Sequence, residues 1–394
     1  MPFFGIFNTS ERQIDLRLFP CGTHEVRQIR RAPQVDRKHL QMSEEEHNSR
    51  TEATGAGEPQ GTPAGPGRHV LQWHITHRCN LLCAHCYQDD RAAHTSVEAL
   101  HETLDKYCRF LAKINCRGHV YLTGGEPLLH PAFCELAEEI TRRGMAFSVL
   151  TNGTLIDLDT ANRLALLHPA FVQVSLDGVG EVHDRVRGLY SFERALKGID
   201  ALTAMHIPVM VSFTAQKSNL KSFPALAKVC AQHGVRKLWW DRVVTDTPQA
   251  TEKLALSTRR FKCFVKKAER LRERYKRADG SFLISMERSL QCMDEGRCYT
   301  CHPGVNMVTI LADGTVMPCR RLPFAVGNIR DGELDELLSS DPTTQKLMQL
   351  PIPEECADCR YAESCRGGAK CVTYGQTGRL FVKDVNCFYK AKKL

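Results

Sequence analysis

The chain has 394 residues, of which 42% are hydrophobic and 18 are cysteines. This length predicts two or three domains with a sizeable core. No apolar run approaches the roughly 18–20 residues needed to cross a bilayer, and the first residues lack the pattern of a secretory signal. The sequence therefore favours a cytoplasmic protein without a membrane partner, in which clustered cysteines bind metal rather than form disulfides.

The formal net charge is +8, and it is concentrated in one segment. Residues 253–277 hold eleven Lys or Arg against two Glu, a local charge of +9, so the remainder sums to about -1. One basic segment does not make a nucleic-acid-binding coat, so nucleic acid is not an expected partner. The segment is either a solvated helix between two domains or a docking site for an acidic partner.

In chain order, residues 1–68 are expected to be a flexible N-terminal region and linker, because residues 43–68 are rich in Gly, Pro, Ser and Glu. Residues 69–245 then alternate between strand-like and helix-like segments. The candidate strands are 70–75, 119–122, 146–150, 172–175, 209–213 and 237–240; the candidate helices are 97–114, 132–143, 159–167, 192–205 and 223–233. Serial β–α units predict an α/β fold with parallel strands, with the active site in the loops after the strands.

The pattern changes after residue 245. Residues 246–290 are expected to form a bridging basic helical segment, and residues 291–394 a small Cys-rich domain. Within that domain, residues 311–319 predict a β-hairpin with an Asp-Gly turn that presents Cys319. Five other cysteines lie in or beside helical patterns and are expected to be buried apolar residues: Cys108, Cys116, Cys134, Cys230 and Cys263.

The strongest chemical signal is the sequence CNLLCAHCY, which follows the first strand and contains Cys79, Cys83 and Cys86. Three thiolates cannot close a tetrahedral site, whereas structural zinc needs four protein ligands. A three-thiolate loop instead suits an iron–sulfur cube with one accessible iron. Further motifs follow later strands: TGGEP at 123–127, TNG at 151–153, SLDG at 175–178 and HDRVRG at 183–188.

These motifs, in this order, resemble the radical S-adenosylmethionine (radical SAM) superfamily over roughly residues 69–245. The resemblance implies a partial (β/α)6 radical SAM barrel in which Cys79, Cys83 and Cys86 bind a 4Fe-4S cluster. It also implies contacts with S-adenosylmethionine. By this resemblance, Tyr87 lies by the adenine, and the methionyl amine is held by Gly124, Gly125 and Glu126. The ribose is contacted by Ser175, with Asn152 or Asp177. The carboxylate of the cofactor pairs with Arg187. No other side chain is assigned as catalytic.

A second group of cysteines lies near the C-terminus, in tight pairs and distant singles, as two separate tetrathiolate centres require. The pattern resembles the SPASM extension of radical SAM enzymes, although a pair of zinc ribbons is an alternative. The resemblance implies one auxiliary 4Fe-4S cluster on Cys356, Cys359, Cys365 and Cys387. The other auxiliary cluster would use Cys301, Cys319 and one upstream cysteine, either Cys298 or Cys292. Its fourth ligand would be Cys371, because the position that usually carries this ligand is Ala369 in this sequence.

The resemblance implies a radical SAM oxidoreductase of the maturase type that forms a 5′-deoxyadenosyl radical and oxidatively modifies a ribosomally synthesised peptide by cross-linking or thioether formation. The alternatives are a formylglycine-forming maturase of the anaerobic sulfatase type and a small-molecule or tetrapyrrole-modifying enzyme. An electron-transfer or cluster-carrier protein would not need the GGEP set. Expected partners are a precursor peptide or protein, a one-electron donor such as flavodoxin or ferredoxin, and a separate leader-peptide-binding protein.

Overall fold

The computed structural model describes residues 67–86, 88, 94–245, 247–276, 281–285, 301 and 303–389. The predicted linker at 1–68 therefore lies almost wholly outside the described residues. The predicted ligands Tyr87, Cys292 and Cys298 also lie outside them.

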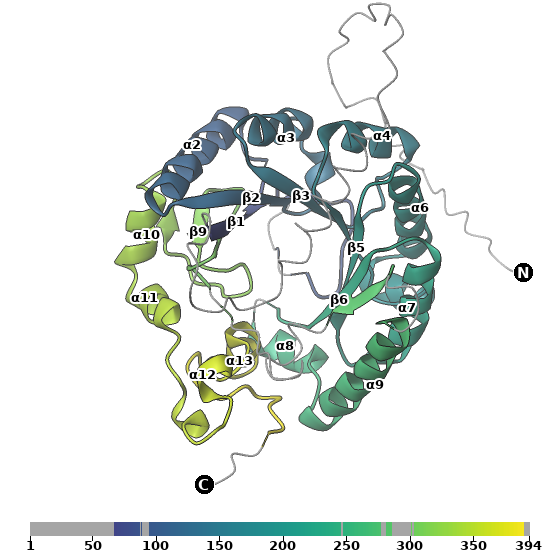
Figure 1. Cartoon of the computed structure of the whole chain (residues 1–394), viewed down its shortest axis with the longest axis vertical. Coiled ribbons are helices and arrows are strands. Elements are labelled where there is room, and N and C mark those ends of the chain that lie inside the picture. Colours follow the sequence, from purple (N-terminus) through teal and green to yellow (C-terminus); the bar gives the residue numbers. More distant parts are fainter. Residues whose placement is uncertain are drawn as a thin grey trace, which may run out of the picture. The chain divides into compact units, whose positions relative to one another are not determined.

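All six predicted strands are present and pair in parallel with their neighbours in chain order. Helices lie along the outer side of these strands (Figure 1), so the α/β prediction is confirmed. The strands are β1 (Gly67–His74), β2 (Cys116–Thr123), β3 (Ala146–Thr151), β4 (Val172–Ser175), β5 (Val209–Ala215) and β6 (Lys237–Arg242). The covering helices are α2 (Val97–Lys113), α3 (Phe133–Arg142), α4 (Leu158–Leu167), α6 (Ser191–Ala204) and α7 (Phe223–Gln232), with short 3-10 turns at η1 (Pro127–Leu129) and η2 (Leu220–Ser222).

The helices begin where the sequence supplies a side chain to satisfy their first free amides. The Ser96 hydroxyl accepts a hydrogen bond from the Ala99 amide at the start of α2, and Asp157 does the same for Thr160 at α4. Helix α2 then buries Leu100, Leu104 and Leu111 at helical spacing against the sheet.

Two helical regions differ from the prediction. The loop after β4 contains a short helix, α5 (Glu181–Arg187), which includes most of the HDRVRG motif. The basic segment forms two helices, α8 (Pro248–Leu254) and α9 (Thr258–Lys276), because Pro248 starts the first and an extended Ala255 ends it. In the ranges that the structure describes, no helix combines the length and apolar character needed to span a bilayer.

The sheet extends beyond the six-strand unit at both edges, which gives the strand order β10-β9-β8-β1-β2-β3-β4-β5-β6-β7. On one side, β7 (Leu283–Ser285) pairs in parallel with β6. On the other, β8 (Met307–Ile310) pairs in parallel with β1, so a strand of the Cys-rich region continues the sheet. The predicted hairpin joins β8 to β9 (Thr315–Met317), and β10 (Gly327–Asn328) pairs with β9. Gly314 makes the turn with φ +89°, a conformation that favours glycine.

The remaining C-terminal elements are α10 (Leu334–Ser340), α11 (Pro342–Gln349), η3 (Glu354–Cys356), α12 (Ala362–Cys365) and α13 (Lys370–Thr377). Helix α10 packs on α2, where the Lys106 ammonium donates to the carbonyls of Ile329 (2.6 Å) and Gly332 (3.2 Å). Leu334 and Leu338 of α10 belong to the same apolar core as the barrel strands. The Cys-rich region therefore shares part of its core with the barrel.

Candidate functional site: a central cavity and an outer thiol pocket

The inner face of the barrel strands is polar, whereas their outer face is apolar. On β4, Val172 and Val174 are wholly buried under the helices, while Gln173 and Ser175 line a cavity of about 350 Å³. Because successive strand residues point to opposite faces, the same alternation on other strands adds further polar side chains to the cavity wall. We call this space the central cavity; its strand residues include Gln72, Tyr121, Thr123, Gln173, Ser175, Ser212, Thr214, Trp239 and Asp241.

Most of these wall residues were not identified from motifs. The sequence nevertheless contains a pattern that marks these residues, because strands of a parallel sheet are normally apolar on both faces. Here alternate positions are polar, as in VQVS of β4 and VSFTA of β5. Polar alternation in a parallel α/β pattern therefore marks the inward residues of a ligand cavity. Within the wall, the Trp239 indole N–H donates to Gln173 Oε1 at 2.9 Å.

The three cysteines of the first motif lie at the end of the cavity where the strands terminate. Cys79, Cys83 and Cys86 all line it. Burial raises the pKa of Cys79 to about 11, and the charges of Glu126, Cys83 and Cys86 add to this effect while the Leu81 amide opposes it. The three sulfurs are therefore close enough to interact, as ligands of one cluster must be.

Gly124 and Gly125 bring the GGEP segment against the backbone of the cysteine loop. The Gly125 amide donates to the Thr76 carbonyl and the Glu126 amide to the Arg78 carbonyl, both at 2.8 Å. A Cβ atom on Gly124 would lie 2.3 Å from the Thr76 oxygen, and one on Gly125 would lie 2.1 Å from the Arg78 oxygen. The glycines therefore allow the close approach that positions the loop, and both also line the cavity.

Glu126 is fully buried beside the cavity. Its carboxylate accepts hydrogen bonds from the Thr151 hydroxyl (2.8 Å) and the Asn152 amide (2.9 Å). Burial raises the pKa of Glu126 to about 7, although these hydrogen bonds oppose the shift. The carboxylate is thus fixed to the TNG motif in the turn that follows β3.

Asn152 connects this turn to the cysteine loop. Its side-chain amide donates to Asn80 Oδ1 at 2.9 Å and lies 3.9 Å from the Cys79 sulfur. Its oxygen accepts from the Thr154 amide at 2.9 Å, which fixes the orientation of the side chain. Ser175 ends the neighbouring strand β4, and its hydroxyl lies 3.4 Å from that of Ser212 on β5.

Asp177 and Arg187 form a buried ion pair, with Arg187 Nε 2.6 Å from Asp177 Oδ2. Burial alone would raise the pKa of Asp177, but Arg187 and His85 hold it below its usual range. Arg187 also lines the cavity and lies 3.9 Å from the Cys83 sulfur, whereas Asp177 lies behind it. The pair therefore places a guanidinium beside the cysteine loop, and the ribose contact of Asp177 stays a prediction.

Three cysteines of the Cys-rich region open on the same central cavity. These are Cys301, Cys319 and Cys371, the last of which is buried in the first turn of α13. Burial raises the pKa of Cys371 to about 11, and the charges of Asp241 and Cys319 contribute to the rise. Cys319 packs against the apolar cluster that contains Cys371, and Cys301 and Ala369 line the same cavity.

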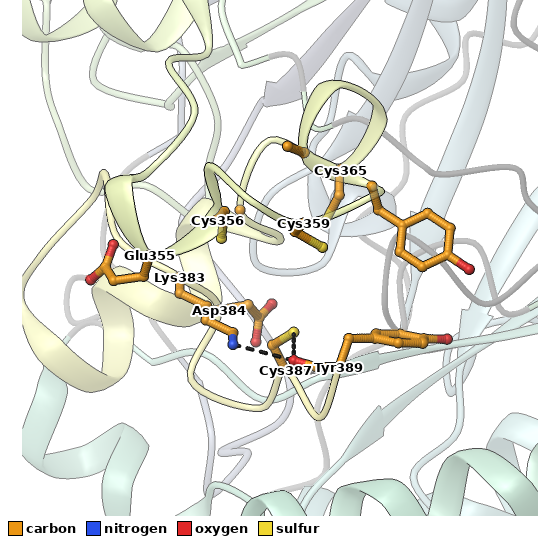
Figure 2. A pocket seen from close by; sticks show the side chains of 11 residues that line it. Glu355, Cys356, Cys359, Cys365, Lys383, Asp384, Cys387 and Tyr389 are labelled. Carbon is orange, nitrogen blue, oxygen red and sulfur yellow. Dashed lines mark hydrogen bonds between the residues drawn. The ribbon is translucent and has the colours of Figure 1, made fainter. Parts of the chain in front are cut away.

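Four other cysteines surround a second hollow, which we call the outer thiol pocket. Figure 2 shows Cys356, Cys359, Cys365 and Cys387 gathered around it from η3, α12 and the C-terminal segment. Burial raises the pKa of Cys356 to about 11, and the charges of Cys365, Cys387 and Cys359 add to the rise while Lys383 opposes it. The structure therefore brings together the whole predicted set.

The wall between the two spaces depends on a pair of glycines. Gly367 and Gly368 have φ of +77° and +90°. A Cβ atom on Gly368 would lie 2.4 Å from the Asp384 Cβ, so only glycine lets these segments meet. Asp384 binds Arg242 of β6 through two hydrogen bonds (2.7 and 2.8 Å) and also accepts from the Ala369 amide (3.1 Å).

The other cysteines are mostly structural. Cys230 is buried in the core, and Cys108, Cys116 and Cys134 pack against it. Cys263, expected to be buried, is exposed on α9, because Phe261, Phe264 and Val265 occupy the buried side of that helix.

All fifteen cysteines of the described ranges are free thiols. In that part of the chain, no three His, Cys, Asp or Glu side chains gather closely enough to hold a single metal ion. The thiols stand around hollows instead, and a 4Fe-4S cluster needs its thiolates set apart in this way because each iron binds a different one.

Comparison with known families agrees with this geometry. The family model of the radical SAM superfamily matches residues 73–221, and that of the SPASM iron–sulfur cluster-binding domain matches residues 298–360. The chain therefore contains a radical SAM domain followed by a SPASM domain. It is a radical SAM enzyme, and its cofactors are 4Fe-4S clusters and S-adenosylmethionine.

Its relatives act on different substrates. An AdoMet-dependent heme synthase of Methanosarcina barkeri is 26% identical over 82% of this chain and 97% of its own length. Mycofactocin maturase MftC of Mycobacterium ulcerans is 28% identical over 76% of this chain and 82% of its own. The structure of anSMEcpe with bound AdoMet and a peptide has the same fold, with a TM-score of 0.68 and 21% identity over 82% of this chain and 94% of that one.

The buried carboxylate of Glu126 predicts a loss of cofactor affinity when its charge is removed. A charge-assisted hydrogen bond contributes about 1.5–3 kcal/mol, so Glu126→Gln is expected to raise the Kd for S-adenosylmethionine about ten-fold or more. Anaerobic equilibrium dialysis of the reconstituted protein measures this. Glu139→Gln, on the outer helix α3, is the control and should bind normally. An unchanged Kd in Glu126→Gln with full iron content would contradict the assignment.

The position of Cys371 predicts that it is a cluster ligand in place of Ala369. Three 4Fe-4S clusters contain about twelve irons, and Cys371→Ala is expected to lose about four of them. Iron and sulfide analysis after anaerobic reconstitution checks this. Cys230→Ala, which removes a thiol from the apolar core, should retain all of the iron. A full complement in Cys371→Ala would show that this cluster does not need the Cys371 thiolate.

Proposed function

We propose that this enzyme oxidatively modifies a ribosomally made peptide by joining two of its side chains through a thioether, C–C or C–O bond. The observation that carries the proposal is the shared central cavity, onto which thiols of both Cys-rich segments open. In this proposal, Cys79, Cys83 and Cys86 hold the cluster that binds S-adenosylmethionine. Cys301, Cys319 and Cys371 hold one auxiliary cluster, and the outer thiol pocket holds the second.

When bound, S-adenosylmethionine and its cluster supply a 5′-deoxyadenosyl radical that removes a hydrogen atom, and the auxiliary clusters supply an acceptor for the second electron. The residues of the chain orient the reactants. Gly125 and Glu126 face the methionyl amine, Arg187 the carboxylate, and Ser175 with Asn152 the ribose. Loss of one hydrogen atom, one electron and one proton is a two-electron oxidation, which balances the formation of one new bond between side chains.

The central cavity has a volume that suits the cofactor, and two relatives support a peptide as the substrate. At about 350 Å³, the cavity is near the lower end of the range for pockets that hold one drug-sized ligand. S-adenosylmethionine is itself a ligand of that size, so the cofactor accounts for most of this volume. The relative MftC is named as a maturase, and anSMEcpe binds a peptide. Both support the peptide proposal.

A tetrapyrrole with acidic side chains is the second candidate. The cavity wall carries Arg187, Arg242, Arg320 and Arg321, and guanidinium groups recognise carboxylates. Asp177, Asp384 and Asp241 already pair with three of these arginines. A substrate carboxylate would therefore compete with existing ion pairs, which places this candidate second, although the heme synthase relative supports it.

The two candidates predict different products. Reconstituted full-length enzyme with S-adenosylmethionine and reductant is expected to form 5′-deoxyadenosine and to make a cysteine-containing peptide encoded beside its gene lighter by a pair of hydrogen atoms. Mass spectrometry of both products checks this, and the Cys79/Cys83/Cys86 triple alanine variant is the inactive control. Conversion of an added tetrapyrrole with carboxylate side chains, with no change to the peptide, would favour the second candidate.

The basic helix α9 has two distinct sides. Its buried side packs on the barrel, where Phe264 contacts Trp240 with ring centroids 4.7 Å apart. Its basic side is exposed, including Arg259, Lys262 and Lys266. The start of α9 also meets the segment that carries Cys387, because Lys262 Nζ lies 5.3 Å from the centre of the Phe388 ring. We therefore propose that this surface docks an acidic one-electron carrier beside the outer thiol pocket.

Charge reversal tests this docking surface. Arg259→Glu with Lys262→Glu is expected to slow electron transfer from reduced flavodoxin roughly ten-fold at low salt and to flatten its salt dependence. Lys197→Glu with Lys228→Glu changes the net charge equally on exposed positions of α6 and α7 and should leave the rate unchanged. Stopped-flow absorbance measures both, and dithionite-driven cofactor cleavage should stay normal. An unaltered salt dependence in the α9 variant would contradict the proposal.

A further inference from the structure

Lys370 is a fully buried lysine in the wall between the central cavity and the outer thiol pocket. It is the first residue of α13, and its chain neighbours Ala369 and Cys371 line the central cavity. Its side chain extends the other way. The ammonium donates to the Arg366 carbonyl and lies against Gly367, where an added Cβ would be 3.3 Å from Nζ. Gly367 lines the outer thiol pocket, so Lys370 reaches from one space to the other.

A buried ammonium is costly unless anionic groups compensate its charge. Burial lowers the pKa of Lys370, and the groups that oppose this shift are, in order, Cys301, Cys365, Cys356 and Asp384. The carboxylate of Asp384 is already engaged by two hydrogen bonds from Arg242. The remaining groups are thiols, one from the central cavity and two from the outer pocket. With clusters on both thiol sets, as the proposed function has it, their thiolates would provide the counter-charge.

We propose that Lys370 is a shared electrostatic positioning residue whose fixed charge raises the reduction potentials of both auxiliary clusters. This inference rests on the proposed function, in which the two thiol sets hold those clusters. One-electron reduction adds one negative charge to a cluster, and a buried cation nearby stabilises the reduced form. Because one ammonium faces both sets, its removal acts on the two potentials in the same direction.

The comparison with Lys383 makes the proposal specific. Lys383 also lines the outer thiol pocket, but it is only partly buried, and its ammonium donates to the Tyr389 carbonyl at 3.3 Å. Its charge acts on Cys356 and Cys387, both of which belong to the outer set. The two lysines thus carry the same charge, but Lys370 faces both thiol sets and Lys383 faces one.

Redox titration monitored by EPR tests this in the full-length reconstituted protein, with dithionite as reductant. Lys370→Met is expected to shift both auxiliary midpoint potentials to more negative values and to leave the radical SAM cluster unchanged. Lys383→Met should shift only one auxiliary potential, and Lys370→Arg should stay near the parent values. Unchanged auxiliary potentials in Lys370→Met, or a shift of only one, would overturn the proposal.

If a variant does not hold its clusters, its iron content is measured in place of its reduction potentials. The shared charge would be supported if Lys370→Met and Lys370→Gln lose iron from both auxiliary sets while Lys370→Arg keeps all of its iron. Loss of iron from only one set would contradict it. Failure of the underlying assignment has a separate signature. A parent protein with only about four irons would lack the auxiliary clusters, which would refute the cluster assignment and Lys370's role with it.

Discussion

The ion pair between Arg242 and Asp384 holds the two halves of the site together. Arg242 ends β6, and Asp384 lies three residues before Cys387, so this ion pair joins the barrel to the outer thiol pocket. Both side chains are 2% exposed, a degree of burial that is tolerated only when the geometry satisfies both charges. The bond from the Ala369 amide to the same carboxylate also fixes the start of α13, and with it Lys370 and Cys371.

This arrangement places cofactor chemistry and charge compensation in adjacent layers. The polar inner face of the strands forms one side of the central cavity, and thiols of the Cys-rich region form another. Beside these thiols lies a layer of buried charges that contains Lys370, Asp384 and Arg242, the last of which also lines the cavity. Clusters with thiolate ligands carry net negative charge, and a layer with more cations than anions offsets it. The buried cations thus offset the charge that thiolates in this wall would carry.

Local sequence patterns predicted the barrel well, because short apolar strands, amphipathic helices and the cysteine motif are encoded within a few residues. The pairing of β8 with β1 was not predicted, since it joins segments far apart in the chain and leaves no local signal. Cys371 was an open alternative to Ala369, because its helical position in α13 shows only in three dimensions. The bonds of Asp177 to Arg187 and the Thr214 amide likewise depend on the packing of separate strands.

The partnership between β1 and β8 also bears on the order in which the protein is made. Strand β1 ends at residue 74 and β8 begins at residue 307, so a ribosome must add roughly 230 residues before the outer edge of β1 gains its partner. Until then the nascent chain presents an open strand edge, the kind of surface that recruits other chains into aggregates. Completing the sheet therefore depends on the C-terminal third, and a truncated chain would keep that edge exposed.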